Sequence, residues 1–104
     1  MPRIAFKMKL HAGQAEEYQR RHDELWPELA DLLRATGIRD YSIFLDKETH
    51  ALFGVLDIKQ PVYLDALPGH PVMQRWWAYM ADIMETHPDG SPVSVSLQEV
   101  FYLP

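Results

Sequence analysis

Apolar and polar residues alternate along residues 3–10, which is the two-residue period of a strand with one buried face. Two apolar segments, 41–46 and 51–58, flank a polar turn at 47–50 and predict a hairpin. The more uniform apolar content of 51–58 indicates a strand covered on both faces. Residues 93–103 alternate again and predict a final strand.

The segment after Gly13 has the period of a helix. Its apolar and aromatic positions follow at intervals of four, three, four and three residues, namely Tyr18, His22, Leu25, Leu29 and Leu32. Pro27 interrupts this helix, because proline lacks the backbone N–H and clashes with the preceding turn. We therefore expect a kink or break near residues 25–27 and an end at Thr36-Gly37.

A second helical region follows the hairpin. Residues 61–67 predict a short helix, and the sequence Pro68-Gly-His-Pro71 predicts a break. Residues 72–85 then predict an amphipathic helix whose inward stripe is Met73, Trp77, Met80 and Met84.

The predicted order is β-α-β-β-α-β, which favours an α+β, ferredoxin-like fold with a four-stranded antiparallel sheet. We expect residues 1–104 to form a single domain. Two helices can cover only one face of such a sheet, yet the other face also carries apolar residues. A second copy of the chain, packed sheet against sheet, is the simplest cover, and this predicts a homodimer.

Composition narrows the classes of partner. The chain has 47% hydrophobic and 24% charged residues, which is ordinary for a globular protein. Its formal net charge of -5 disfavours nucleic-acid binding, and the absence of cysteine excludes disulfides and thiolate chemistry. The sequence has no apolar run long enough for a membrane span and no signal peptide, so we expect a cytoplasmic protein. The classes of binding partner that remain are a small-molecule ligand and another protein.

An imidazole and a phenol continue the line of buried leucines on the first helix. Burying such polar groups is costly unless they have partners or a function. His22 has an ordinary pKa near 6.5, which suits it to give and take protons near neutrality. The alternative is a histidine at the edge of the core, bonded to a neighbouring carbonyl. Tyr18 lies one turn before His22, and Tyr41 opens the second predicted strand.

Trp76 and Trp77 form the third part of the candidate site. Adjacent helical residues point about 100° apart, so one indole should face the sheet and the other should flank a cleft. An aromatic core is the alternative reading. Together with the phenols and His22, these indoles suit a sugar ring, whose C–H faces stack on aromatics while its hydroxyls need directional hydrogen bonds.

Other chemistry finds little support in the sequence. No histidine pair has metal-ligand spacing, and there is no phosphate-binding glycine loop and no nucleophile elbow. We therefore expect no metal and no cofactor. His70 could cap a helix or reach the site, and capping is the expectation we favour. His11, His50 and His87 are expected to be solvated.

The chain resembles the L-rhamnose mutarotase family over essentially its whole length. No single segment is a strong motif, but their occurrence in this order is specific. The segments are Glu17–His22 (EYQRRH), Trp26–Leu29 (WPEL), Tyr41–Lys47 (YSIFLDK), Gln74–Trp77 (QRWW), Met80, Pro92–Ser94 and Leu97–Pro104.

The resemblance implies a cofactor-independent isomerase with a dimeric α/β-barrel type of ferredoxin-like fold. Such an enzyme interconverts the α and β anomers of L-rhamnose and so supports rhamnose metabolism. At the family's positions, His22 would be the proton donor, and the sugar would be bound by Tyr18, Tyr41, Trp76 and Trp77.

Two other functions remain open at this point. Cofactor-free monooxygenases share this fold, and an inward histidine with tryptophans would also serve their aromatic substrates. A non-catalytic sugar-binding dimer is the second alternative.

Overall fold

The computed structural model describes residues 2–104. In chain order the elements are β1 (Arg3–Lys9), α1 (Ala15–Asp23), α2 (Pro27–Ala35), β2 (Ile38–Leu45), β3 (Ala51–Ile58), the 3-10 helix η1 (Pro61–Gly69), α3 (Pro71–Met80) and β4 (Val95–Leu97). Apart from the division of the first helical region, this is the predicted β-α-β-β-α-β order. Among residues 2–104, no helix is long and apolar enough to span a membrane.

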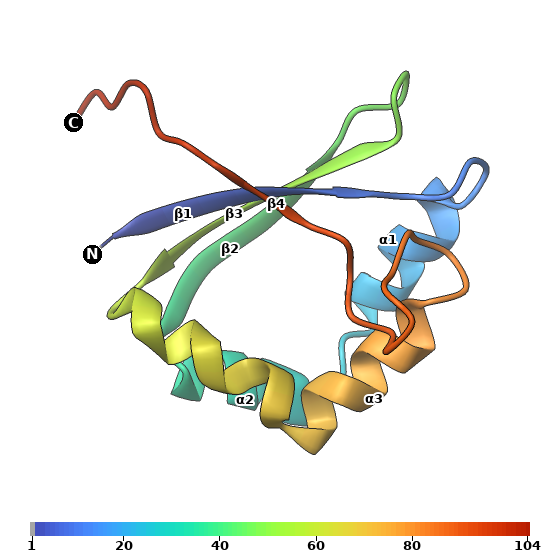
Figure 1. The fold of residues 1–104 in the computed structure, drawn as a ribbon, viewed down its shortest axis with the longest axis horizontal. Helices are drawn as coiled ribbons and strands as arrows, with labels where there is room; N and C mark the ends of the chain where they lie inside the picture. Colours follow the sequence, from blue (N-terminus) through green and yellow to red (C-terminus); the bar gives the residue numbers. More distant parts are fainter. Residues whose placement is uncertain (1) are drawn as a thin grey trace.

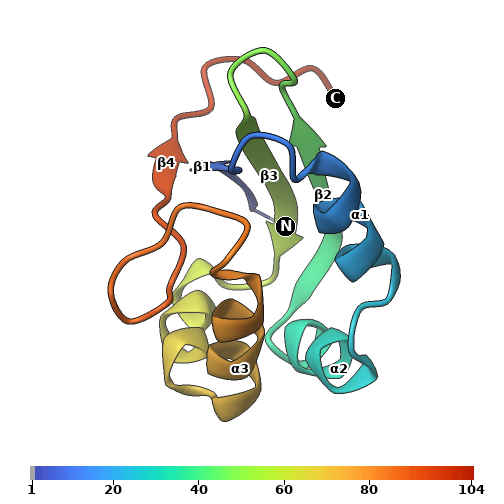
Figure 2. The same ribbon diagram turned by 90° about the vertical axis from the view of Figure 1, so that its right-hand side faces the viewer.

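The four strands form one antiparallel sheet in the order β2-β3-β1-β4. The helices lie on one side of this sheet (Figure 1). α2 and α3 contact each other and lie side by side beneath the sheet (Figure 2). This arrangement confirms the ferredoxin-like α+β prediction.

The sheet has one covered and one uncovered face in the single chain. On β3, alternate residues are buried beneath the helices, and Leu52 and Ile58 are almost fully enclosed. The outer face has large apolar side chains exposed, among them Phe44 at 62% and Val95 at 54%. We expected residues 51–58 to be covered on both faces. The helices cover the inner face of β3, whereas its outward residues are only half-buried, so the expectation is met on the helix side only.

The first helical region divides where proline was expected to break it. Trp26 has extended backbone angles and caps α2, and Pro27 takes the first helical position. Proline fits there because its missing N–H would have no intrahelical partner. The break lets α1 and α2 run in different directions, as the views in Figures 1 and 2 show.

The start of β2 and the end of α3 both differ from the prediction. β2 begins at Ile38, and a bulge between Arg39 and Ser42 interrupts its pairing with β3. Asp40 lies in this bulge at a φ of 50°, a conformation that aspartate tolerates better than most residues. The predicted helix over 72–85 ends at Met80, and the chain turns there to reach an isolated bridge between Leu10 and Met84.

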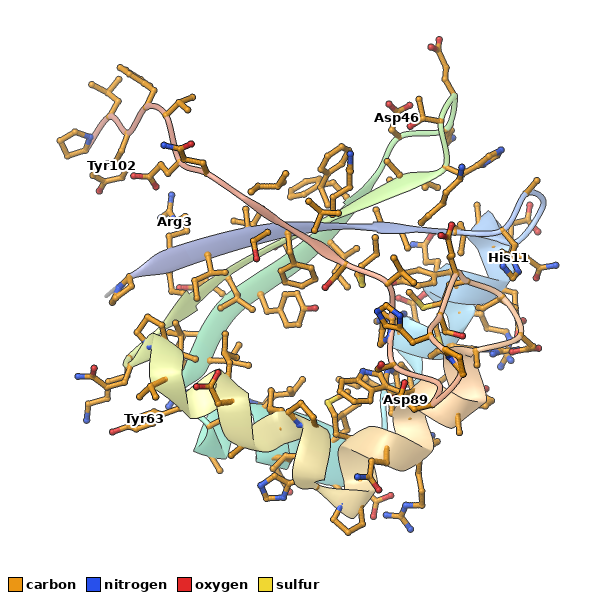
Figure 3. The ribbon with its side chains drawn as sticks, in the orientation of Figure 1. Arg3, His11, Asp46, Tyr63, Asp89 and Tyr102 are labelled. Carbon is orange, nitrogen blue, oxygen red and sulfur yellow. The ribbon has the colours of Figure 1, made fainter. Side chains whose placement is uncertain are left out.

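The predicted final strand is mostly unpaired. Only Val95–Leu97 pairs with β1, opposite Ala5–Lys7, and the rest of the tail is outside the sheet. Residues 98–104 are exposed, with Phe101 at 77%. The tail remains close to β1, since the guanidinium carbon of Arg3 lies 5.8 Å from the ring centroid of Tyr102 (Figure 3).

Candidate active site

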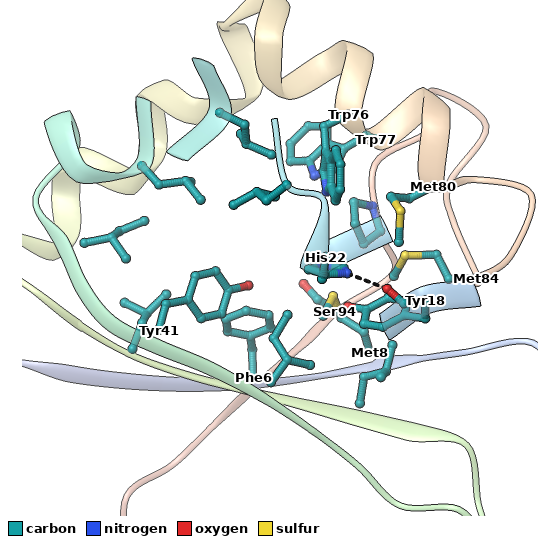
Figure 4. A pocket seen from close by; sticks show the side chains of 18 of the residues that line it. Phe6, Met8, Tyr18, His22, Tyr41, Trp76, Trp77, Met80, Met84 and Ser94 are labelled. Atoms are coloured by element: carbon teal, nitrogen blue, oxygen red, sulfur yellow. Dashed lines mark hydrogen bonds between the residues drawn. The ribbon is translucent and has the colours of Figure 1, made fainter. Parts of the chain in front are cut away.

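A cavity of about 1240 Å³ lies between the inner face of the sheet and the helices. Its volume exceeds the roughly 300–1,000 Å³ typical of small-molecule sites. The cavity is lined by side chains from β1, α1, β2 and α3 and from the segment before β4 (Figure 4). All five residues proposed from the sequence line it: Tyr18, His22, Tyr41, Trp76 and Trp77.

His22 is held in a defined tautomer by its own helix. Its Nδ1 lies 2.9 Å from the backbone oxygen of Tyr18, one turn earlier. A carbonyl can only accept, so Nδ1 donates and the neutral ring carries its proton there. Within residues 2–104 the other nitrogen, Nε2, makes no hydrogen bond to the protein. Every fully buried side-chain nitrogen in these residues has a hydrogen-bond partner, so an unbonded Nε2 cannot be fully buried. Nε2 is therefore accessible from the cavity.

Burial sets the charge of His22. Removal from water disfavours the imidazolium and lowers its pKa below 6.5, and this effect outweighs the bond to Tyr18 and the nearby Asp23, which both act in the opposite direction. His22 is therefore mainly neutral at pH 7, with a lone pair on Nε2 available to accept a proton.

Tyr18 packs against the same imidazole. Its ring centroid lies 4.3 Å from that of His22, with the planes at 31°. Tyr18 is buried, and burial raises the pKa of its phenol well above its usual value. The hydroxyl is thus protonated at neutral pH and can both donate and accept hydrogen bonds.

Tyr41 reaches the cavity from the bulge in β2. Because the bulge interrupts the pairing with β3, this position lies outside the regular ladder, and such bulges commonly redirect a side chain. The Tyr41 ring meets the edge of Phe6, with centroids 6.1 Å apart. Its surface is 37% exposed at the cavity, but the surrounding chain still raises the pKa of the hydroxyl to about 12.

The two tryptophans have different surroundings. Trp76 is buried and meets His22 edge-on, with ring centroids 5.3 Å apart, whereas Trp77 is half-buried. The predicted stripe, which placed Trp77 inward with Met73 and Met80, was wrong on this point. Trp76 follows Met73 by three residues and precedes Met80 by four, so it satisfies the same helical period. Trp77 flanks that stripe and still lines the cavity.

Phe6 is a site residue that the sequence argument did not identify as such. Its ring lies over Gly54 on β3, where a Cβ atom would overlap it. The pair forms a flat apolar surface on the sheet side of the cavity, beside Tyr41. The available signal was a glycine inside a strand, which often marks a close approach of another group. Ser94 also lines the cavity, from the segment before β4.

Two further expectations concern histidines and metals. His70 occupies the N-cap position of α3, but its side chain makes no capping hydrogen bond, so the capping prediction was wrong. Across residues 2–104, no group of three or more histidine, aspartate or glutamate side chains is arranged to hold a metal ion.

Three kinds of comparison with known proteins identify the same family. The model of the L-rhamnose mutarotase family matches residues 3–103. An L-rhamnose mutarotase from Jannaschia sp. is 61% identical over 104 residues, with all of both chains covered. One from Brucella anthropi is 61% identical over 102 residues, covering 98% of this chain and 96% of the relative. The crystal structure of an L-rhamnose mutarotase from Formosa agariphila superposes with a TM-score of 0.93 at 47% identity, again over all of both chains.

More distant structures share the fold alone. An antibiotic biosynthesis monooxygenase superposes with a TM-score of 0.61 at 12% identity, over 96% of this chain and 99% of that one. A dimeric ferredoxin-like protein from an uncultured marine organism gives 0.58 at 14% identity, over 97% and 96%. The matches to the family model and to the two relatives, in contrast, extend along nearly the whole sequence. The chain belongs to the L-rhamnose mutarotase family.

Proposed function

We propose that this protein interconverts the α and β anomers of L-rhamnopyranose, with His22 as the proton donor and without a cofactor. The observation that carries the proposal is the accessible Nε2 of His22 in a cavity whose lining includes the phenols of Tyr18 and Tyr41, two indoles and many apolar side chains. Family membership supports the same activity.

Anomerisation opens and recloses a hemiacetal, so one proton must leave the C1 hydroxyl and one must reach the ring oxygen. Neutral His22 accepts the hydroxyl proton on Nε2. The electron pair left on that oxygen forms the C1 carbonyl as the C1–O5 bond breaks, and the imidazolium donates its proton to O5. Rotation about C1–C2 presents the other carbonyl face, and the same transfers in reverse close the ring. A positioned acid or base typically contributes about 10²–10⁴ in rate.

The remaining site residues are assigned to recognition. Tyr18 and Tyr41 have raised pKa values and are poor bases at neutral pH, so their hydroxyls are assigned to the hydroxyls of the sugar. Trp76 and Trp77 supply flat apolar surfaces for the C–H face of the ring and for its C6 methyl group.

We further propose that two copies pack sheet against sheet. Support comes from the outer face of the sheet, where Phe44, Val95 and Leu97 are exposed although the helices cover the other face. These residues lie on β2 and β4, the two edge strands of the sheet, and exposed apolar surface on an uncovered sheet face commonly marks an interface. Three expectations stay predictions. They are that residues 1–104 form one domain, that the protein is cytoplasmic, and that it binds no nucleic acid, metal or cofactor.

The direct test is proton NMR exchange between the two anomers of L-rhamnose at neutral pH, with catalytic protein and a buffer-matched blank. Accelerated exchange is the expected result. Tryptophan fluorescence that responds to the sugar without accelerated exchange would identify a binding module instead. Oxygen consumption with an aromatic substrate, and no effect on the sugar, would favour a monooxygenase.

A further inference from the structure

Arg21 immediately precedes His22 in the same helical turn, yet it does not line the cavity. Its side chain is only 9% exposed, and it is the buried charged residue of the described chain. Its Nε bonds Glu17 at 2.7 Å, and its Nη1 bonds the backbone oxygen of Tyr79 at 2.6 Å. Nη1 and Nη2 also bond the carboxylate of Asp82, at 2.9 and 3.3 Å.

These partners belong to two different parts of the fold. Glu17 is on α1, whereas Tyr79 is in the last turn of α3 and Asp82 follows it. A cation at a helix C-terminus interacts favourably with the last carbonyls of that helix. Arg21 therefore joins the helix that carries Tyr18 and His22 to the helix that carries the tryptophans.

The contact continues through aromatic rings to the site. The Arg21 guanidinium carbon lies 4.4 Å from the ring centroid of Tyr79. That ring stacks on Trp26 at 5.6 Å and meets Trp76 at 5.7 Å. Trp76 in turn packs against His22. Arg21 is thus linked to His22 along the backbone of α1 and, separately, through the rings that pack on α3.

We propose that Arg21 is a positioning residue for the mutarotase reaction, because its guanidinium holds α1 against the end of α3 and so fixes the His22 ring relative to Trp76. This inference rests on the proposed function. Arg21 makes its bonds to two carboxylates and a carbonyl from three separate nitrogens of a planar fork, whereas the three N–H donors of lysine share one nitrogen, so lysine should not reproduce all of them.

Arg21→Lys is the first test, with Arg20→Lys as the matched control. Arg20 is the neighbouring arginine on α1 and also bonds Glu17, but its side chain is 52% exposed and its second partner, Glu24, lies on the same helical segment. We expect Arg21→Lys to lower kcat at least five-fold with KM changed less than two-fold, since Trp77 and Tyr41 still bind the sugar. Arg20→Lys should leave both constants unchanged.

A second readout does not depend on catalysis. NMR titration of the His22 ring should show its pKa moving up toward the ordinary value in Arg21→Lys, as the ring gains access to water. Wild-type kcat together with a wild-type His22 titration in folded Arg21→Lys would overturn the proposal. If the wild-type protein does not accelerate anomer exchange, the proposed function fails, whereas the titration still decides whether Arg21 positions His22.

Asp82→Asn provides the same test should Arg21→Lys fail to fold. It removes a charge from the side chain that bonds both terminal nitrogens of Arg21, while Asp82 itself is exposed and outside the cavity. We expect a smaller decrease in kcat and a His22 titration shifted in the same direction. An unchanged titration in folded Asp82→Asn would overturn the proposal.

Discussion

The imidazole of His22 and the indole of Trp76 meet edge-on, with their planes at 88° and their centroids 5.3 Å apart. One ring comes from α1 and the other from α3, so the packing of these helices decides how much water reaches the imidazole. The ring of Tyr18 covers His22 further, at 4.3 Å. These two contacts give the burial that lowers the pKa of His22 and leaves Nε2 as the nitrogen that faces the cavity.

Replacing His22 with alanine should remove the proton-transfer group and leave the fold intact, since His22 is only half-buried. We expect turnover to fall by at least about ten-fold, because a positioned acid or base typically contributes about 10²–10⁴ in rate. Anomer exchange by NMR measures this, and sugar-dependent fluorescence should show that binding persists. His11→Ala, at an exposed histidine, is the control. Full activity in His22→Ala would refute the assignment.

The pH dependence follows from the direction of the His22 pKa. Because burial lowers this pKa below 6.5, the ring is mainly neutral at pH 7 and takes up a proton only as the pH falls further. The mechanism begins with neutral His22, so the catalysed kcat/KM should be level between pH 7 and 8 and should decrease below pH 6.5. The phenols of Tyr18 and Tyr41, whose pKa values are raised by burial, stay uncharged in this range. A catalysed rate that rises toward pH 5 would contradict the proposed order of proton transfers.

Truncation of the two tryptophans should have different consequences. Trp76 is 6% exposed and packs in the core, so Trp76→Ala should cost about 3–5 kcal/mol of unfolding free energy. Trp77 is half-buried at the cavity, so Trp77→Ala should chiefly raise KM or the dissociation constant for the sugar. Denaturant unfolding and sugar titrations distinguish the two effects. Unchanged binding and stability in Trp77→Ala would show that this indole does not contact the sugar.

Gly54 should tolerate no side chain while Phe6 is present. A Cβ atom at Gly54 would overlap the Phe6 ring, and overpacking of this kind typically costs about 1–3 kcal/mol. We expect Gly54→Ala to lower the midpoint of thermal unfolding and to weaken sugar binding, because the displaced ring moves against Tyr41. Gly69→Ala, where nothing lies near the added atom, should be silent. The double variant Gly54→Ala with Phe6→Leu should recover part of the stability, and no recovery would mean that Phe6 is not the obstacle.

The helical site residues could be identified from the sequence because they lie on periodic elements. Tyr18 and His22 continue the leucine stripe of the first helix, and Pro27 marks the break between α1 and α2. Such short-range patterns are fixed by helix geometry and by the missing N–H of proline, and both are visible in a single sequence.

Features that depend on long-range contacts could not be predicted in the same way. The choice between Trp76 and Trp77 depends on how α3 rotates against the sheet, and both satisfy the helical period. The Phe6–Gly54 contact joins β1 and β3, and the Arg21 contacts join α1 to α3. The extent of β4 depends on its pairing with β1, which the alternation of the tail does not reveal.

The outer face of the sheet should be an interface between two copies of the chain. Lysine in place of Phe44 puts a charge on this face, and burying an unpaired charge is strongly unfavourable. We expect the wild-type protein to be a dimer by size-exclusion chromatography with light scattering at micromolar concentration, and Phe44→Lys to shift it toward monomer. Val62→Lys is the matched control, because Val62 is as exposed, at 65%, but lies on η1, on the helix side. A monomeric wild-type protein would refute the proposed dimer. A dimer that persists in Phe44→Lys would show that the interface lies on another surface.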